Sequence, residues 1–250
     1  MTGKGSAVAA QEEEAQGWQD IAQGELEAAE RHFRRALELD PSRADALNGL
    51  GTVYLSWGDL EEAAELFRMA ILQAEQDLPR RKRRTGWQDA QVRPYVRGLY
   101  HLSLTQIRRG LWDEAIDLLR ELIAWDSGGM DGEAHYLLGQ MQQRHGRLEE
   151  AAAAYTAASA HLDEAWYALG LVRFLEGRER EARAAWREAL GRLPGVVPFL
   201  LYYPRLVPIP APRIEDTPFL ILRRYVIDNA DLWTSAARAA LEELAREQSE

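Results

Sequence analysis

Glycine, alanine and large apolar residues recur along this chain with a period of about 34 residues. Each copy has a glycine, an alanine five positions later and a large side chain four positions after that alanine. The glycines and large side chains are Gly24 with Phe33, Gly58 with Phe67, Gly110 with Leu119, Gly146 with Tyr155, and Gly177 with Trp186. Such a period is typical of paired helices that stack into an all-α solenoid.

The residue types fit this arrangement for physical reasons. Glycine and alanine let two helices approach closely, and an aromatic ring fills the space between them. Pro41 and Pro194 come where the second helix of a copy should end, because proline cannot continue a helix. We therefore predict five helix pairs, at 10–43, 44–77, 96–129, 132–162 and 163–196.

The pattern is interrupted or absent in four places. We expect a flexible N-terminus over 1–9 and an inserted basic loop over 78–94. Seven of the ten prolines lie between Pro194 and Pro218, which predicts an extended proline-rich segment over 197–217. Two amphipathic helices are expected in 218–250, at about 218–228 and 231–247, where they would cap the solenoid.

The proline-rich segment is too apolar for a solvated linker. Residues 198–212 carry eight large apolar or aromatic side chains. They should therefore fold back on the repeats, either into the concave groove, where the segment would compete with a partner, or over the end of the fifth pair near Trp186 and Leu190.

The repeated residues resemble those of the tetratricopeptide repeat family, as Leu47, Leu50, Gly51 and Tyr54 show in the second copy. The resemblance implies a right-handed α-solenoid that binds proteins, with the first helix of each pair lining a concave groove. At the family's groove positions the last three copies place Arg97, Tyr100, Leu104, Arg108, Tyr136, Gln140, Arg144, Tyr167, Leu171 and Phe174.

Three tyrosines, Tyr100, Tyr136 and Tyr167, share one motif position in successive copies. They would form a ladder of rings in the groove, and such rings offer large contact areas at low entropic cost. The alternative is that these tyrosines only pack between neighbouring helices.

The part of the chain from Arg93 onward is also similar to bacterial relatives of the suppressor of tumorigenicity seven family. The similarity rests on the Arg93–Pro94–Tyr95 start of a helix, on Val197 to Leu201 after the last repeat, and on Trp233 with Leu241. The segment from Ser127 to Asp131 departs from that family's pattern. This resemblance implies no catalytic residues.

Charge and composition exclude several classes of function. The net charge of −10 and the pI near 5.1 argue against general binding of nucleic acid, and the absence of cysteine removes thiol chemistry and thiolate metal sites. No histidine pair has metal-binding spacing, and no nucleophile, base and orienting residue occur together. We therefore expect no enzyme, no metal and no cofactor.

One charged run stands against the acidic background. It consists of Arg80, Arg81, Lys82, Arg83 and Arg84. Five adjacent cations could dock nucleic acid or an acidic or phosphorylated partner, and the alternative is a solvated loop.

The chain also carries hints of its source and compartment. It has two lysines, Lys4 and Lys82, among 30 basic residues, which indicates a GC-rich bacterial genome. No leader-like or membrane-spanning apolar run is present, so we expect a cytoplasmic protein. The sequence as a whole predicts a non-catalytic scaffold whose concave groove binds a peptide or helix of a partner protein.

Overall fold

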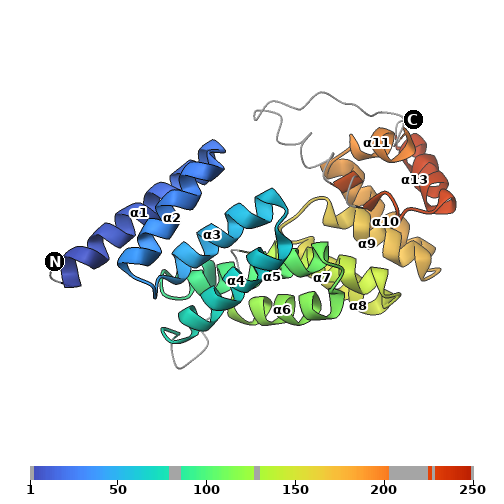
Figure 1. The fold of residues 1–250 in the computed structure, drawn as a ribbon. Coiled ribbons are helices and arrows are strands. Elements are labelled where there is room, and N and C mark those ends of the chain that lie inside the picture. The colour runs from blue at the N-terminus through green and yellow to red at the C-terminus, as the bar shows by residue number, and fades with distance from the viewer. Residues whose placement is uncertain (1–2, 79–85, 127–129, 203–224, 227–228, 249–250) are drawn as a thin grey trace. The chain divides into compact units, whose positions relative to one another are not determined.

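The computed structural model describes residues 3–78, 86–126, 130–202, 225–226 and 229–248 (Figure 1). These residues form helices and connecting turns, with no strand among them. The chain divides into two compact units, Met1–Ala134 and His135–Glu250. The basic run 80–84 and residues 203–217 of the proline-rich segment lie outside the described residues.

The first unit contains three helix pairs. Its helices are α1 (Gly3–Gln23), α2 (Leu26–Leu39), α3 (Ala44–Trp57), α4 (Leu60–Glu75), α5 (Arg93–Arg108) and α6 (Trp112–Trp125), with a short 3₁₀ helix η1 (Gly86–Gln88) before α5. Consecutive helices pack against each other, and α3 also packs against α5. The first helices of successive pairs therefore lie side by side.

The second unit contains the last two pairs and the C-terminal elements. Its helices are α7 (Asp131–Arg144), which begins within the first unit, α8 (Leu148–Ala158), α9 (Ala165–Leu175), α10 (Glu179–Arg192), α11 (Val196–Tyr202) and α13 (Ser235–Glu247). One continuous apolar core joins these pairs to the C-terminal elements and includes Trp186, Leu200, Tyr225, Trp233 and Leu241.

The five turn glycines end the first helix of each pair in the left-handed region. Gly24, Gly58, Gly110, Gly146 and Gly177 have φ between 71° and 91°, and they are the only described residues with such a φ. A left-handed backbone favours glycine, because other residues meet a steric penalty there. The repeat frame expected from the sequence is thus present in all five pairs of the described structure.

In four of the five pairs the second helix presses its aromatic side chain onto a glycine of a first helix. A Cβ atom added to Gly49 would lie 2.2 Å from the Phe33 ring, and one added to Gly170 would lie 2.2 Å from the Trp186 ring. Gly139 makes the same contact with Tyr155, at 2.7 Å. Glycine therefore sets the distance between the helices, as the residue pattern predicted.

The boundaries outside the repeats differ from those expected. Helix α1 begins at Gly3 rather than at residue 10, because Ser6 to Ala10 contain good helix formers and no turn residue. Helix α11 occupies the start of the segment expected to be extended. Its Pro198 lies in the first helical turn, where a missing backbone N–H costs nothing, so the prediction of an extended chain was wrong there.

The C-terminal helices are described in part. Helix α13 covers Ser235–Glu247 of the expected 231–247, and the side chain of Thr234, the residue before it, caps its first turn by accepting from the Ala237 N–H. Most of the expected helix at 218–228 lies outside the described residues. No helix in the described part of the chain is long and apolar enough to cross a bilayer.

Candidate functional site

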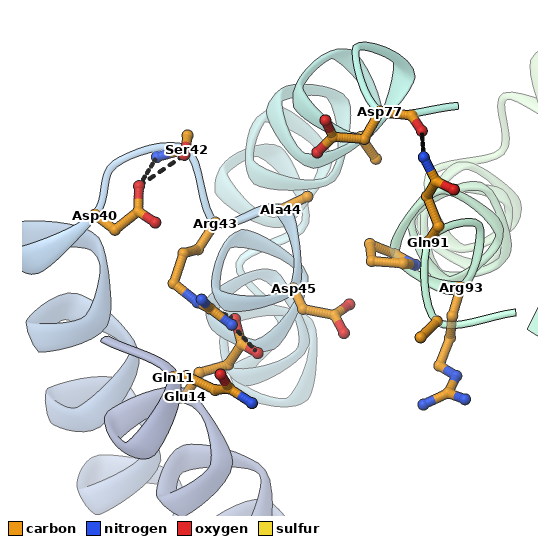
Figure 2. Close-up of a pocket in the computed structure, with 13 residues that line it drawn as sticks. Gln11, Glu14, Asp40, Ser42, Arg43, Ala44, Asp45, Asp77, Gln91 and Arg93 are labelled. Atoms are coloured by element: carbon orange, nitrogen blue, oxygen red, sulfur yellow. Dashed lines mark hydrogen bonds and ion pairs between the residues drawn. The ribbon is translucent and has the colours of Figure 1, made fainter. Parts of the chain in front are cut away.

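A polar pocket of about 450 Å³ opens in the first unit (Figure 2). Its walls come from α1, from the turn between α2 and α3, from the end of α4, and from the residues that lead into α5. The polar lining residues are Gln11, Glu14, Asp40, Ser42, Arg43, Asp45, Asp77, Gln91 and Arg93. Gln11, Glu14 and Asp45 stand at groove positions of the first two repeats, so the pocket lies at one end of the predicted groove.

Internal pairs neutralise much of the charge in this pocket. Both carboxylate oxygens of Glu14 accept hydrogen bonds from Arg43, at 2.8 and 2.9 Å, and these bonds raise the pKa of Arg43. Asp40 accepts from the Ser42 hydroxyl at 2.6 Å, which lowers the pKa of Asp40. These bonds hold the turn between α2 and α3 in place and join it to α1.

Arg97, a predicted groove residue, is held among two indole rings and a carboxylate. Its guanidinium carbon lies 4.3 Å from the centre of the Trp18 ring and 5.1 Å from that of Trp87, and its Nη1 lies 3.0 Å from Asp45 Oδ1. Trp87 belongs to η1, and its backbone N–H donates to the buried Asp126. Arg97 thus joins α1, α3 and η1, and only 14% of its side chain remains exposed.

The other predicted groove residues of the first unit are more accessible. Tyr100 and Leu104 are half-buried on α5, and Arg108 is exposed at its end. Arg108 Nη1 donates to the Leu55 carbonyl of α3 at 2.8 Å. Helices α3 and α5 therefore share a partly open surface on which half-buried Leu104 lies one turn from exposed Arg108.

In the second unit the predicted groove residues contact the C-terminal part of the chain. Asn229 is buried, and its Nδ2 donates to the Tyr136 hydroxyl at 2.9 Å while its Oδ1 accepts from Gln140 Nε2 at 2.9 Å. Arg144 Nη1 lies 2.5 Å from Asp231 Oδ2, and this bond lowers the pKa of Asp231. Three predicted groove residues of α7 thus bind two residues of one C-terminal segment.

Aromatic contacts extend the same interface over α9 and α10. Tyr225 packs against Tyr167, with ring centres 5.8 Å apart, and Trp233 stacks on Trp186 at 5.7 Å. The Trp233 Nε1–H donates to the Tyr225 hydroxyl at 3.2 Å. Burial raises the pKa of Tyr225 and of Tyr136 well above 10, so both hydroxyls stay protonated.

Of the two arrangements expected for the three tyrosines, two members follow the alternative, in which the rings pack between neighbouring helices. Tyr136 and Tyr167 are buried, and the Tyr167 hydroxyl donates to the Leu193 carbonyl at 2.7 Å. The reason is that C-terminal side chains cover both rings. Leu171 is also buried, and Phe174 packs against Trp186.

The residues that the sequence reasoning missed are Tyr225, Asn229 and Asp231. One signal in the sequence was the rarity of asparagine, which occurs at Asn48 and Asn229 alone. The structure shows that both of these side chains are buried. Asn48 Nδ2 donates to the Pro94 carbonyl at 2.8 Å, so each asparagine joins separate elements. No group of three or more histidine, aspartate or glutamate side chains in the described ranges could hold a metal ion.

Comparison with protein families identifies the repeats. A family model described as tetratricopeptide repeat matches residues 14–78 and 100–161, about half of the chain. The chain belongs to the tetratricopeptide repeat family. Proteins of this family bind other proteins or peptides and are typically non-catalytic.

Curated relatives match through the repeats alone. The chain is 29% identical over 144 residues to "Cellulose synthase 1 operon protein C" of Komagataeibacter xylinus, a match that covers 58% of this chain and 10% of that protein. It is 40% identical over 55 residues to "Cellulose synthase operon protein C" of the same organism, covering 22% of this chain and 4% of that protein. The matched region spans a tenth or less of these relatives.

Solved structures show the same fold at low identity. A crystal structure of MamA has a TM-score of 0.56 at 22% identity and covers 70% of this chain and 92% of its own. YrrB, described as "a TPR protein with an unusual peptide-binding site", has a TM-score of 0.54 at 22% identity and covers 72% and 84%. A thermophilic TPR protein of Thermus thermophilus has a TM-score of 0.52 at 22% identity and covers 78% and 97%. These likenesses show the tetratricopeptide fold.

The similarity to the suppressor of tumorigenicity seven family is not confirmed by these comparisons. The tetratricopeptide assignment therefore stands on the repeats alone.

Proposed function

We propose that this tetratricopeptide protein is a non-catalytic scaffold that binds a peptide or helix of a partner protein on the first helices of its repeats. One observation carries the proposal. The first helices α7 and α9 already hold a peptide segment, since Tyr136, Gln140 and Tyr167 contact Asn229 and Tyr225. Residues at the family's groove positions can therefore fix a chain segment by side-chain contacts.

The surface of α3 and α5 is the accessible counterpart in the first unit. Leu55 and Leu104 are half-buried there, and Arg108 is exposed. Apolar patches beside a cation suit an amphipathic helix or an extended peptide that carries a carboxylate. We assign the partner site to this surface.

A photo-crosslinking amino acid in place of Leu104 tests the proposal in the full chain. The matched control carries the same amino acid in place of Met69, which is 52% exposed on α4, the second helix of its pair. The Leu104 site should crosslink a discrete partner that mass spectrometry identifies, and the Met69 site should not. Equal yields of the same product from both sites would contradict the proposal.

The salt dependence of binding separates groove binding from docking on the basic run. Binding through apolar and aromatic contacts should weaken only slightly with ionic strength, whereas binding of a phosphorylated or nucleic-acid partner should weaken steeply. The partner captured at Leu104 should show the slight dependence. A steep loss would favour the basic run over this surface.

A further inference from the structure

The described residues of the C-terminal segment, 225–226 and 229–233, contact groove positions of α7 and α9 and also Trp186 of α10. Four of its residues make these contacts: Tyr225 packs on Tyr167, Asn229 bonds Tyr136 and Gln140, Asp231 pairs with Arg144, and Trp233 stacks on Trp186. All of these residues belong to the second unit. The segment thus covers predicted groove residues of α7 and α9.

The centre of this interface is polar, which distinguishes it from a simple apolar cap. Asn229 is 1% exposed, and its amide makes three hydrogen bonds, two to α7 side chains and one to the Tyr225 carbonyl at 2.7 Å. Buried amide contacts of this kind add little net stability but fix which side chain fits. The groove therefore selects an amide at this point, and an arbitrary apolar residue would leave Tyr136 and Gln140 without partners.

The edge of the interface is charged and solvent-accessible. The Asp231 side chain is 61% exposed and the Arg144 side chain 25% exposed, although they form an ion pair. Such a pair is weak and can exchange partners. An incoming carboxylate can thus reach Arg144 before the buried contacts open.

We propose that Tyr225–Trp233 is an intramolecular ligand, which a partner segment of the same chemistry replaces. That partner carries an aromatic residue, an amide four positions later, a carboxylate two positions after the amide and a tryptophan two positions further on. The inference rests on the proposed function, because it extends partner binding to α7 and α9. When residues 225–233 occupy the groove, they compete with the partner for the same positions. The apparent affinity for the partner is therefore reduced in proportion to the fraction of molecules in which the segment has left the groove.

A synthetic peptide of residues 222–236 serves as the probe, and the full chain is its receptor. The Asp231→Arg chain places a cation opposite Arg144, which should open the intramolecular contact without a cavity because Asp231 is exposed. The labelled peptide should bind this variant at least about tenfold more tightly than the wild-type chain. The matched control is Asp163→Arg, which disrupts another exposed pair, between Asp163 and Arg192, and should bind like wild type.

Changes in the peptide test whether the same contacts form in trans. A peptide with Asn229→Ala should lose most of its affinity for the Asp231→Arg chain. A peptide with Asp231→Arg should bind poorly to that chain but well to a chain that carries Arg144→Glu alone, in which the introduced glutamate repels the chain's own Asp231 and pairs with the arginine of the peptide. Restored affinity requires direct contact at this position, so a nonspecific effect of the peptide would not produce it.

Several results would overturn the inference. One is a folded Asp231→Arg chain, verified by circular dichroism, that does not bind the peptide. Another is a dimer of that chain in light scattering without peptide, which would assign the surface to a second copy. Neither result affects crosslinking at Leu104 in the first unit, so the proposed function would remain separately testable.

Discussion

At the level of single residues, glycines beneath aromatic rings hold four of the five helix pairs together. Gly170 of α9 lies under Trp186, and the ring Nε1–H donates to the Tyr167 carbonyl at 3.2 Å. The ring has no room to retreat, because its other neighbours include Phe174 and Trp233. The pair thus depends on the absence of a side chain at one position.

Gly170→Ala should destabilise the protein by about 1–3 kcal/mol, because its Cβ would lie 2.2 Å from the Trp186 ring. Gly191→Ala is the matched control in α10, where an added Cβ meets nothing within 4 Å. That change should be neutral or stabilise by up to about 1 kcal/mol. Urea unfolding of both variants measures the difference, and equal stabilities would contradict the close-approach account.

A second residue, His101, is held neutral by its surroundings. Its ring stacks on Phe67 with centres 5.4 Å apart, and its Nδ1 is buried without a hydrogen-bond partner among the described residues. Burial, with a smaller contribution from Arg97, lowers the pKa of His101 to about 4. The folded protein therefore resists protonation that the unfolded chain accepts near pH 6.5.

Between pH 6.5 and 4 the unfolded state binds more protons at His101 than the folded state does. The free energy of unfolding therefore has its full value above pH 6.5 as far as His101 is concerned. It decreases by up to roughly 3 kcal/mol as the pH drops toward 4. His101→Leu should remove this contribution to the pH dependence. Unfolding free energies at several pH values measure it, and parallel curves for the variant and wild type would refute it.

At the level of elements, one arginine joins the C-terminal segment to the last repeat. Arg238 of α13 donates to the Leu200 carbonyl of α11 at 2.7 Å and to the Ala230 carbonyl at 2.7 Å. Its Nε also donates to the Trp233 carbonyl at 3.3 Å. A planar guanidinium can satisfy three carbonyls at once, which an ammonium on a flexible stem does less well.

Arg238→Lys should therefore loosen α11 and α13 together, with a loss of about 1–3 kcal/mol. Hydrogen exchange resolved by peptide should show faster exchange in both helices. Arg246→Lys in the same helix is the control, since Arg246 makes an exposed pair with Glu242 and no hydrogen bond or ion pair among the described residues ties it to α11. Unchanged exchange in α11 would show that Arg238 does not join the two elements.

The sequence predicts the repeat elements well, because each repeat packs mainly against the next one in the chain. The residues that make these contacts therefore recur at short, regular spacings in the sequence. The fourth copy shows this in detail: the 31-residue spacing of Gly139 and Gly170 predicts a short second helix that ends near Ala160, and α8 ends at Ala158. The sequence pattern did not predict helix α11, because the number of prolines after residue 194 indicates an extended chain and says nothing of where in a helix each proline would lie. Proline is disfavoured in the interior of a helix but is tolerated in the first turn, where Pro198 lies.

The sequence predicted which residues lie at the candidate site, but it did not predict that the C-terminal part of the chain covers them. Family positions located Tyr136, Gln140 and Arg144 on one helix face. Their partners Asn229 and Asp231 are roughly 90 residues distant in the chain and belong to no repeat. Contacts of this range leave no periodic signal, so a single sequence cannot show that the groove is covered.

At the level of the whole molecule, the proposed partner surfaces are divided between the two units. The surface of α3 and α5 is partly open, whereas that of α7 and α9 carries the C-terminal segment. The central claim is that a partner binds along first helices, because their residues at groove positions can hold a peptide. The second helices are expected not to contact the partner, even though one of them, α4, carries the exposed apolar residues Met69 and Leu72.

Hydrogen exchange of the full chain, with and without the partner captured at Leu104, tests this claim most directly. Binding should slow exchange in α3 and α5, and it should speed exchange around Asn229 if the partner also displaces the C-terminal segment. Protection restricted to the second helices α4 and α6, with α3 and α5 unchanged, would contradict the account.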